Sequence, residues 1–268
     1  IEKNWQVIFE DKTTSLELKA DHSALIMKQI WDFSQTVDID DVKEILDRQI
    51  TCNMAIANEG IHNSYGANIG HVILNMDSDC VKTKAKAYAA AGSDARMNGC
   101  ELPVVINSGS GNQGITCCVP VVVYAKELDC TQEQLYRALV LSNLTAIYIK
   151  TGIGTLSAFC GAVSAGAAAG AGIAYLHDGT YEEIQHTIVN TLAILSGTIC
   201  DGAKASCAAK IASSIDAGIM GYYMYKNKQQ FYAGDGIVAH SVDETIQNIG
   251  TLGSQGMLQT NDKIIEMM

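Results

Sequence analysis

Two cysteines of this 268-residue chain stand in a context that suits metal binding. Cys160 and Cys200 are each followed closely by a glycine, and each precedes a run of small residues, in "CGAVSAGAAAG" and "CDGAKASCAAK". A thiol just before a helix lies near unpaired backbone N–H groups and the positive end of the helix dipole, which favour the metal-binding thiolate. If the two helix starts meet in space, they provide two soft metal ligands. The alternative is that both cysteines are ordinary small core residues.

The other seven cysteines carry weaker signals. Cys207 forms an i, i+4, i+8 stripe with Ile211 and Ile215, which is typical of a helix face in the core. Cys117 and Cys118 are adjacent, so at most one of them can point at a given site. The six histidines are scattered without an HxH or HExxH pair, so a histidine zinc site is not expected. Buried inert thiols are the simpler interpretation of the remaining four cysteines: Cys52, Cys80, Cys100 and Cys130.

A glycine-rich stretch, "NSGSGNQG", is the second candidate site. Its three glycines, set between polar side chains, allow backbone N–H groups to converge on an anion such as a carboxylate or a phosphate. The stretch lacks the Gly-Lys-Ser/Thr end of a P-loop and the spacing of a dinucleotide-binding GxGxxG motif. The stretch is too glycine-rich for regular structure, so it is a loop or the sharp entrance to a helix. A tight connection that needs positive φ angles is the alternative to a binding site. The candidate substrate-binding residues are Asn107, Ser108, Gly109, Ser110, Gly111, Asn112 and Gln113.

The elements that must position these residues are mostly helices. Residues 5–20 are predicted to form two short strands, the remnant of a larger sheet. From Asp38 to Gly60 the sequence has acids at the start and a glycine at the end, which predicts a helix. We expect an α+β protein, predominantly α, with a small N-terminal β remnant in residues 1–36 and a Gly/Ala-rich helical bundle in residues 37–268. Its helices are predicted at Ser78–Gly92, Thr131–Lys150, Gly161–Leu176, Thr180–Leu195, Ala203–Lys226 and Val242–Leu252.

The composition disfavours several classes of protein. With 18 basic and 29 acidic residues, a net charge of −11 and no Lys/Arg run, the chain would repel nucleic acid. Nine cysteines are sparse and odd in number, which predicts reduced thiols and a cytoplasmic protein. Residues 151–176 carry no charge and are long enough to span a bilayer, so a membrane carrier is a rival interpretation. Their many glycines and alanines favour a helix buried in a bundle, with no membrane partner.

Four stretches of the chain resemble one enzyme family: "NGCELPVVINSGSGNQGIT", "CGAVSAGAAAGAGIAYL", "GTICDGAKASCAAKIASS" and "ETIQNIGTLGSQGM". They are similar to the iron-sulfur L-cysteine desulfidases, a family related to the alpha chain of the iron-sulfur L-serine dehydratases. The resemblance covers essentially the whole chain, which corresponds to the C-terminal part of a family member. Residues 37–268 therefore resemble the helical catalytic domain of a serine dehydratase alpha chain.

The resemblance implies a [4Fe-4S] cluster that is held by three cysteines and leaves one iron open to the substrate. Cys160 and Cys200 match two of the ligand positions. The third ligand is expected in a Gly-Cys-Thr-Glu-Pro segment upstream of Ile1, and no such segment occurs in this sequence. A companion N-terminal segment is therefore one expected partner, and a homo-oligomer is another.

The activity implied by the resemblance is the conversion of L-cysteine to hydrogen sulfide, ammonia and pyruvate. The open iron would act as a Lewis acid on the β-thiol of this amino-acid substrate while a base removes the α-proton. We expect the glycine-rich stretch to hold the α-carboxylate, with Asn112 and Gln113 as donors. Lys204, just beyond Cys200, is a candidate catalytic residue, and a solvated helix lysine is its alternative. The rival functions are an L-serine dehydratase with the same cluster and a non-catalytic piece of a larger enzyme.

Overall fold

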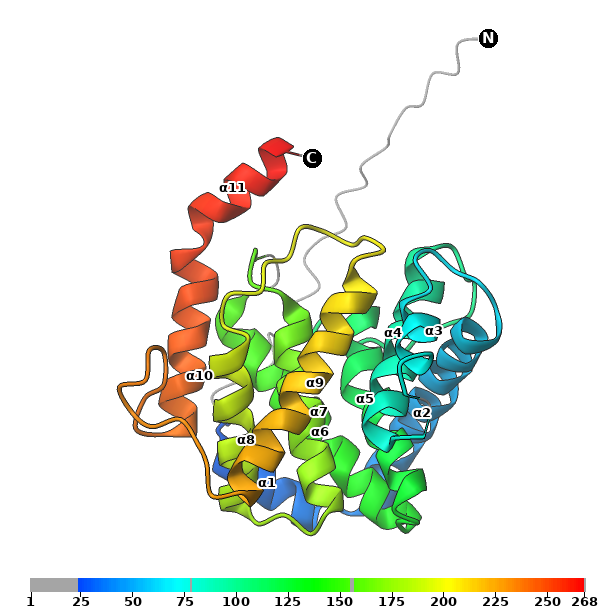
Figure 1. Ribbon diagram of the computed structural model, residues 1–268. Coiled ribbons are helices and arrows are strands. Elements are labelled where there is room, and N and C mark those ends of the chain that lie inside the picture. The colour runs from blue at the N-terminus through cyan, green and yellow to red at the C-terminus, as the bar shows by residue number, and fades with distance from the viewer. Residues whose placement is uncertain (1–23, 78, 155–156, 268) are drawn as a thin grey trace, which may run out of the picture.

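The computed structural model describes residues 24–77, 79–154 and 157–267, which form a helical bundle (Figure 1). No strand occurs within these ranges, and the predicted strands of residues 5–20 lie outside them. The division into 1–36 and 37–268 stays a prediction. The elements are α1 (Met27–Thr36), α2 (Ile39–His62), α3 (Ile69–Leu74), α4 (Val81–Met97), α5 (Gly111–Glu127), α6 (Gln132–Ile153), α7 (Gly161–Leu176), α8 (Tyr181–Ile194), α9 (Cys207–Lys226), α10 (Val242–Thr251), the π-helix η1 (Leu252–Gly256) and α11 (Leu258–Met267).

Helix α7 lies at the centre of the bundle, in contact with α5, α6, α8 and α9. Its glycines and alanines are nearly all buried. A Cβ added to Gly170 of α7 would lie 2.9 Å from the Cα of Gly218 in α9, and one added to Gly166 would lie 2.6 Å from the Ser214 side chain. The two helices therefore cross at backbone contact, which only small residues allow. The predicted Gly/Ala-rich bundle is confirmed.

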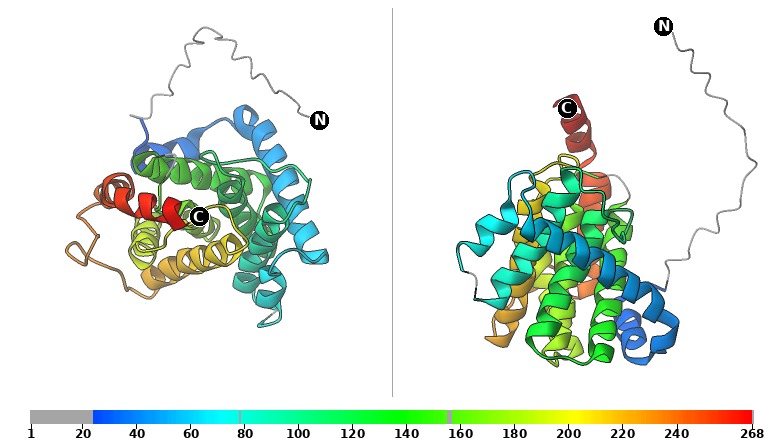
Figure 2. Two further views of the ribbon diagram at one scale, coloured as in Figure 1. Left: turned by 90° about the horizontal axis from the view of Figure 1, so that it is seen from above. Right: turned by 90° about the vertical axis from the view of Figure 1, so that its right-hand side faces the viewer.

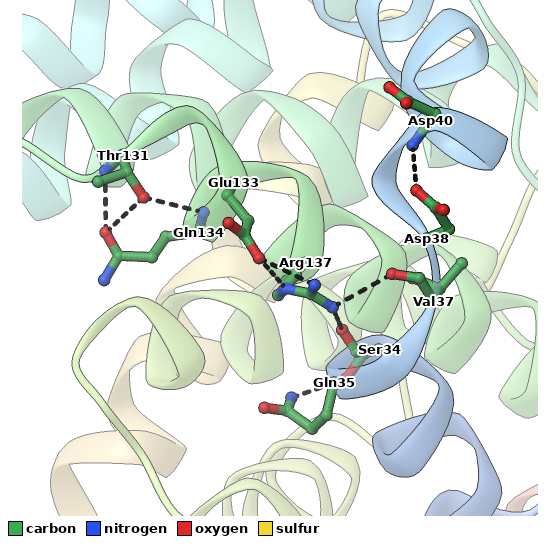
Figure 3. Close-up of polar contacts among 9 residues, drawn as sticks. All are labelled: Ser34, Gln35, Val37, Asp38, Asp40, Thr131, Glu133, Gln134 and Arg137. Carbon is green, nitrogen blue, oxygen red and sulfur yellow. Dashed lines mark hydrogen bonds and ion pairs between the residues drawn. The ribbon is translucent and has the colours of Figure 1, made fainter.

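Arg137 of α6 fastens the end of α1 to the bundle (Figure 3). Its guanidinium donates to the backbone carbonyls of Ser34 at 3.0 Å and Val37 at 3.5 Å, and it pairs with Glu133 at 2.9 Å. Carbonyls at a helix C-terminus have no partner within their own helix, so a cation there satisfies them. Helix α11, at the other end of the chain, projects beyond the rest of the bundle (Figure 2).

Three parts of the chain differ from the helices predicted from sequence. Residues 111–127 form α5, so the glycine-rich stretch is the entrance to a helix that the sequence left open as a loop. Ile69–Leu74 forms the short helix α3, which was not predicted. Helix α9 begins at Cys207 and not at Ala203, because the residues before it form turns closed by i to i+3 bonds, such as the 3.0 Å bond from the Cys207 N–H to the Lys204 carbonyl. Residues 201–206 are therefore a loop.

The uncharged run 151–176 is not one continuous helix. Helix α6 ends at Ile153, Gly154 has a φ of 89°, and α7 begins at Gly161. Among the residues that the structure describes, no helix combines the length and the hydropathy needed to cross a membrane.

Candidate functional site

Backbone pairing brings Cys160 and Cys200 together. The Cys160 N–H donates to the Thr198 carbonyl at 3.1 Å, and the Cys200 N–H donates to the Ala158 carbonyl at 2.6 Å. Between these bonds, Phe159 and Ile199 form an isolated antiparallel bridge. This pairing joins the segment before α7 to the segment after α8, and the two thiols are hydrogen-bonded to each other. The predicted meeting of the two cysteines is present, although only Cys160 is the N-cap of a helix.

The two thiols have opposite pKa shifts. The hydrogen bond from Cys160, the backbone N–H of Gly202 and the positive charge of Lys210 lower the pKa of Cys200 to about 6, against the effect of burial. The same thiol–thiol hydrogen bond and burial raise the pKa of Cys160. The opposite shifts make Cys200 the thiol of the pair that loses its proton more readily, with the Cys160 thiol as its hydrogen-bond donor. A thiolate is the form in which cysteine binds metal.

A cavity of about 380 Å³ lies over this pair. The residues around it come from the ends of α4 and α6, the starts of α5, α7 and α9, and the loops between them. We call Cys160, Cys200 and Cys207 the cysteine wall, and Arg96, Ser110, Asn112 and Gln113 the amide wall. Among the described residues, no carboxylate lines the cavity, although acids outnumber bases in the chain. Three cations of the same residues line it: Arg96, Lys150 and Lys210. The cavity is therefore suited to an anionic ligand.

The glycine-rich stretch is divided by its local structure. Its Asn107 and Ser110 exchange two backbone hydrogen bonds of 3.1 and 3.0 Å, and the turn between them needs the positive φ of Ser108, 49°, and Gly109, 80°. Ser110 is the N-cap of α5, and its side chain accepts from the Gln113 N–H. Of the predicted site residues in this stretch, four line the cavity: Gly109, Ser110, Asn112 and Gln113.

The other three residues of the stretch have structural surroundings. The Asn107 side chain donates to the side-chain oxygen of Asn143 at 3.0 Å, and the Ser108 hydroxyl donates to the Asn107 side chain. Both residues line a different, largely apolar cavity between α2 and α6. Gly111 lies against Arg96, because a Cβ added to it would lie 2.3 Å from the Arg96 Nε.

Lys204 is exposed in the loop before α9 and does not line the cavity, so it has neither the helical setting nor the position predicted from sequence. Two other lysines do line it. Lys150, near the end of α6, donates to the Gly154 carbonyl at 2.5 Å, and burial lowers its pKa. Lys210 donates to the Ile199 carbonyl at 3.0 Å and pairs with Asp201. Sequence reasoning missed both lysines, because each sits in an ordinary helix with no motif around it.

Cys207 is also placed differently from its prediction as a core residue. It is half-buried at the first position of α9, and its sulfur accepts from the Lys204 N–H at 3.5 Å and donates to the Gly202 carbonyl at 3.6 Å. The short spacing between Cys200 and Cys207 is evident in the sequence. In a helix beginning at Ala203, however, Cys207 would lie on the core-facing stripe and not at the cavity. All nine cysteines lie in the described part of the chain, and all are free thiols.

Comparison with known proteins shows the family of the chain. Residues 5–266 match the family described as the serine dehydratase alpha chain. The chain belongs to this family. UPF0597 proteins match it over its whole length, with 57% identity in Desulfitobacterium hafniense, 52% in Lachnoclostridium phytofermentans and 49% in Finegoldia magna. The chain spans 63%, 64% and 64% of the length of these relatives. No solved structure matches it.

Proposed function

We propose that this chain is the cluster-binding part of an iron-sulfur lyase that converts L-cysteine and water to hydrogen sulfide, ammonia and pyruvate. The observation that carries the proposal is the shared cavity, in which two hydrogen-bonded cysteines and the start of α5 line one space. Membership of the serine dehydratase alpha chain family supports a lyase. L-Serine is the second candidate substrate, because the family takes its description from serine dehydratase.

The residues of the cavity include soft ligands of the kind that hold an iron-sulfur cluster. In the described part of the chain, no three His, Cys, Asp or Glu side chains form a group that could hold a metal ion, so the two cysteines need a third ligand. Cys160 and Cys200 would be two of the three ligands, and the nearby Lys210 would offset part of the negative charge of thiolates and cluster.

The third ligand has two candidates. The family resemblance implies a cysteine in an upstream Gly-Cys-Thr-Glu-Pro segment. Cys207 is the alternative, because it lines the same cavity and its sulfur is fixed by the backbone of residues 202 and 204. We propose Cys207→Ser in the full-length protein as the deciding variant. If Cys207 is the ligand, the iron content falls; if the upstream cysteine is the ligand, it does not.

The chain's own residues would perform the remaining tasks. A bound cluster supplies an open iron that acts as a Lewis acid on the β-substituent of the substrate. The start of α5 would orient the amino acid through its polar side chains and backbone N–H groups. Lys150 is better placed than Lys204 to take the α-proton, because it lines the cavity and its burial favours the neutral amine.

The proposed activity can be tested with the full-length protein after anaerobic reconstitution with iron and sulfide. Release of sulfide from L-cysteine and of ammonia from both amino acids would be measured. We expect faster turnover of L-cysteine than of L-serine; equal turnover of L-serine would contradict the choice of substrate. The rival, a chain that is inactive alone, is tested with residues 1–268. If this chain shows no iron-sulfur absorbance after reconstitution and gains it when the upstream segment is added, the rival is favoured.

A further inference from the structure

We propose that the amide wall recognises both charges of the amino-acid head group: Arg96 binds the α-carboxylate, and the Gln113 side-chain oxygen accepts a hydrogen bond from the α-ammonium group. The inference rests on the proposed function, in that the ligand is an amino acid whose β-substituent is directed to the cysteine wall. It assigns the carboxylate to a residue that carries no sequence motif. It also changes the predicted role of Gln113 from a carboxylate donor to an ammonium acceptor.

Arg96 has donors to spare. It lies in the last turn of α4, is half-buried, and lines the cavity. Its Nη1 donates to the Asn112 side-chain oxygen at 3.3 Å, and none of the described carboxylates lies within ion-pair distance of it. A guanidinium presents five N–H groups in a planar fork that matches a carboxylate. In a chain with an excess of acids, an arginine in a cavity without an acidic partner is placed for an anionic ligand.

Gly111 makes the position of Arg96 possible. A Cβ on this glycine would lie 2.3 Å from Arg96 Nε and 2.7 Å from the Val104 side chain. The guanidinium therefore packs against the backbone of the first turn of α5, where unpaired N–H groups also favour a negative charge. The arginine and the helix start together form one subsite for a carboxylate.

Gln113 supplies the opposite polarity. Its side chain is 7% exposed, and its Oε1 atom is buried without a hydrogen-bond partner. The amide lies across the start of α7, because a Cβ added to Gly161 would lie 2.6 Å from its Nε2 atom. A buried acceptor without a partner is unfavourable, so a ligand that donates to it is bound more tightly. An ammonium group has only donors, and no carboxylate of the cavity competes for it.

Asn112 connects the two subsites. Its side-chain oxygen accepts from Arg96, and it is the neighbour of Gln113 in the first turn of α5. The carboxylate and the ammonium group of an α-amino acid are bonded to one carbon, so they require two subsites side by side. Cys160 and Gly161 begin α7 next to the Gln113 amide, which places the β-substituent of such a ligand toward the cysteine wall.

The test uses two thiols that each carry half of the head group. 3-Mercaptopropionate has the carboxylate and lacks the ammonium group, whereas cysteamine has the ammonium group and lacks the carboxylate. Their dissociation constants would be measured by calorimetry with the reconstituted full-length protein, so that the result does not depend on turnover. We expect Arg96→Ala to weaken the binding of 3-mercaptopropionate about 10-fold or more and to leave the binding of cysteamine unchanged. We expect Gln113→Leu to weaken the binding of cysteamine and to leave that of 3-mercaptopropionate unchanged.

Matched variants separate recognition from damage to the fold. Arg137→Ala and Gln49→Leu remove a half-buried arginine and a buried glutamine outside the cavity, and neither should alter the binding of either thiol. Gln113→Glu keeps an acceptor and should restore cysteamine binding. Circular dichroism and the melting temperature would verify the fold of each variant.

The outcomes distinguish this proposal from the proposed function. Three results would overturn the head-group assignment. Each variant could lose affinity equally for both thiols, neither variant could lose affinity for either thiol, or the wild-type protein could bind neither thiol. If L-cysteine is turned over and the crossed pattern is absent, the assignment fails while the lyase stands. If the crossed pattern appears without turnover of either amino acid, the lyase fails while the amino-acid site stands.

Discussion

The two walls of the cavity are built in different ways. Cys160 and Cys200 meet through backbone pairing between segments that are far apart in the sequence, whereas Ser110, Asn112 and Gln113 are neighbours at the start of one helix. The cysteine wall therefore depends on how α7 packs against α8 and α9. The α5 part of the amide wall depends on the local capping of that helix, and Arg96 joins it from the end of α4. Disturbing the packing should affect the first wall more, and removing a cap should affect the second.

The walls also differ in the charge that they favour. The cysteine wall contains the Cys200 thiol of lowered pKa and is flanked by Lys210, which suits thiolate ligands and a cluster of net negative charge. The amide wall has one cation, Arg96, and one acceptor without a partner, on Gln113. One wall thus presents soft metal ligands and the other presents hydrogen-bonding groups of both polarities. The proposal that they contact opposite ends of one substrate rests on this difference.

The largest effect is expected from the cysteine wall. Cys200→Ser in the full-length protein removes the thiolate, and we predict that iron content and L-cysteine turnover fall at least about 100-fold, since even residues around metal ligands matter by 10- to 100-fold. Iron analysis and a sulfide assay would measure both. Cys130→Ser is the matched control, because this half-buried thiol does not line the cavity. Retention of iron and activity in Cys200→Ser would remove Cys200 from the ligand set.

The next effect concerns the packing that supports both walls. Gly170→Val places a branched side chain where the Gly218 backbone is 2.9 Å from the new Cβ. We expect a loss of about 3 kcal/mol in the free energy of unfolding, because the helices must separate. Thermal unfolding would measure it. Gly197→Val is the control, since nothing lies within 4 Å of a Cβ there; equal loss in both variants would contradict the backbone contact.

A smaller effect should separate the amide wall from general stability. Ser110→Ala removes the cap of α5, and Ser241→Ala removes the corresponding cap of α10. Each should lower the free energy of unfolding by about 1 kcal/mol. Only Ser110→Ala should also raise the KM for L-cysteine, because the cap positions the first turn of α5 in the cavity. A raised KM in both variants would point to stability as the cause.

The smallest effect is expected outside the cavity, where Asp216 of α9 pairs with Lys86 at 2.9 Å and Lys82 at 3.1 Å of α4. Burial raises the pKa of Asp216, but the hydrogen bonds from both lysines outweigh it and the pKa is lowered. The stabilisation is therefore present above the ordinary aspartate pKa of about 3.9 and is lost as the pH falls below it. Melting temperatures between pH 7 and pH 3 should fall more steeply for the wild type than for Asp216→Asn. Parallel curves would contradict this.

The sequence predicted most of the helices and the meeting of Cys160 with Cys200. Helix periodicity, acidic starts and glycine stops act locally, so they can be recognised in a single chain. The start of α5 at the glycine-rich stretch was left open, because glycines permit a loop and a helix entrance equally. The start of α9 was misplaced, because the alanines after Gly202 have helical propensity, whereas residues 203–206 form a loop of bends and turns in the folded chain.

The charged residues of the cavity could not be predicted from the sequence. Arg96, Lys150 and Lys210 are single cations within helices, where a solvated position is the ordinary expectation. They line one cavity only because α4, α6 and α9 all have one end there. The prediction for Lys204 depended on a helix that does not include it. Tertiary packing, and not spacing along the chain, decides which lysine lies near the cysteines.

The central claim is that both walls contact one substrate of an iron-sulfur lyase. The most direct test is the Mössbauer spectrum of the full-length protein, reconstituted anaerobically, before and after addition of L-cysteine under conditions that slow turnover. We predict the signals of a [4Fe-4S] cluster, of which one iron changes on addition of L-cysteine and none changes on addition of L-alanine, which lacks the thiol. Absence of a cluster, or a spectrum that L-cysteine leaves unchanged, would contradict the claim.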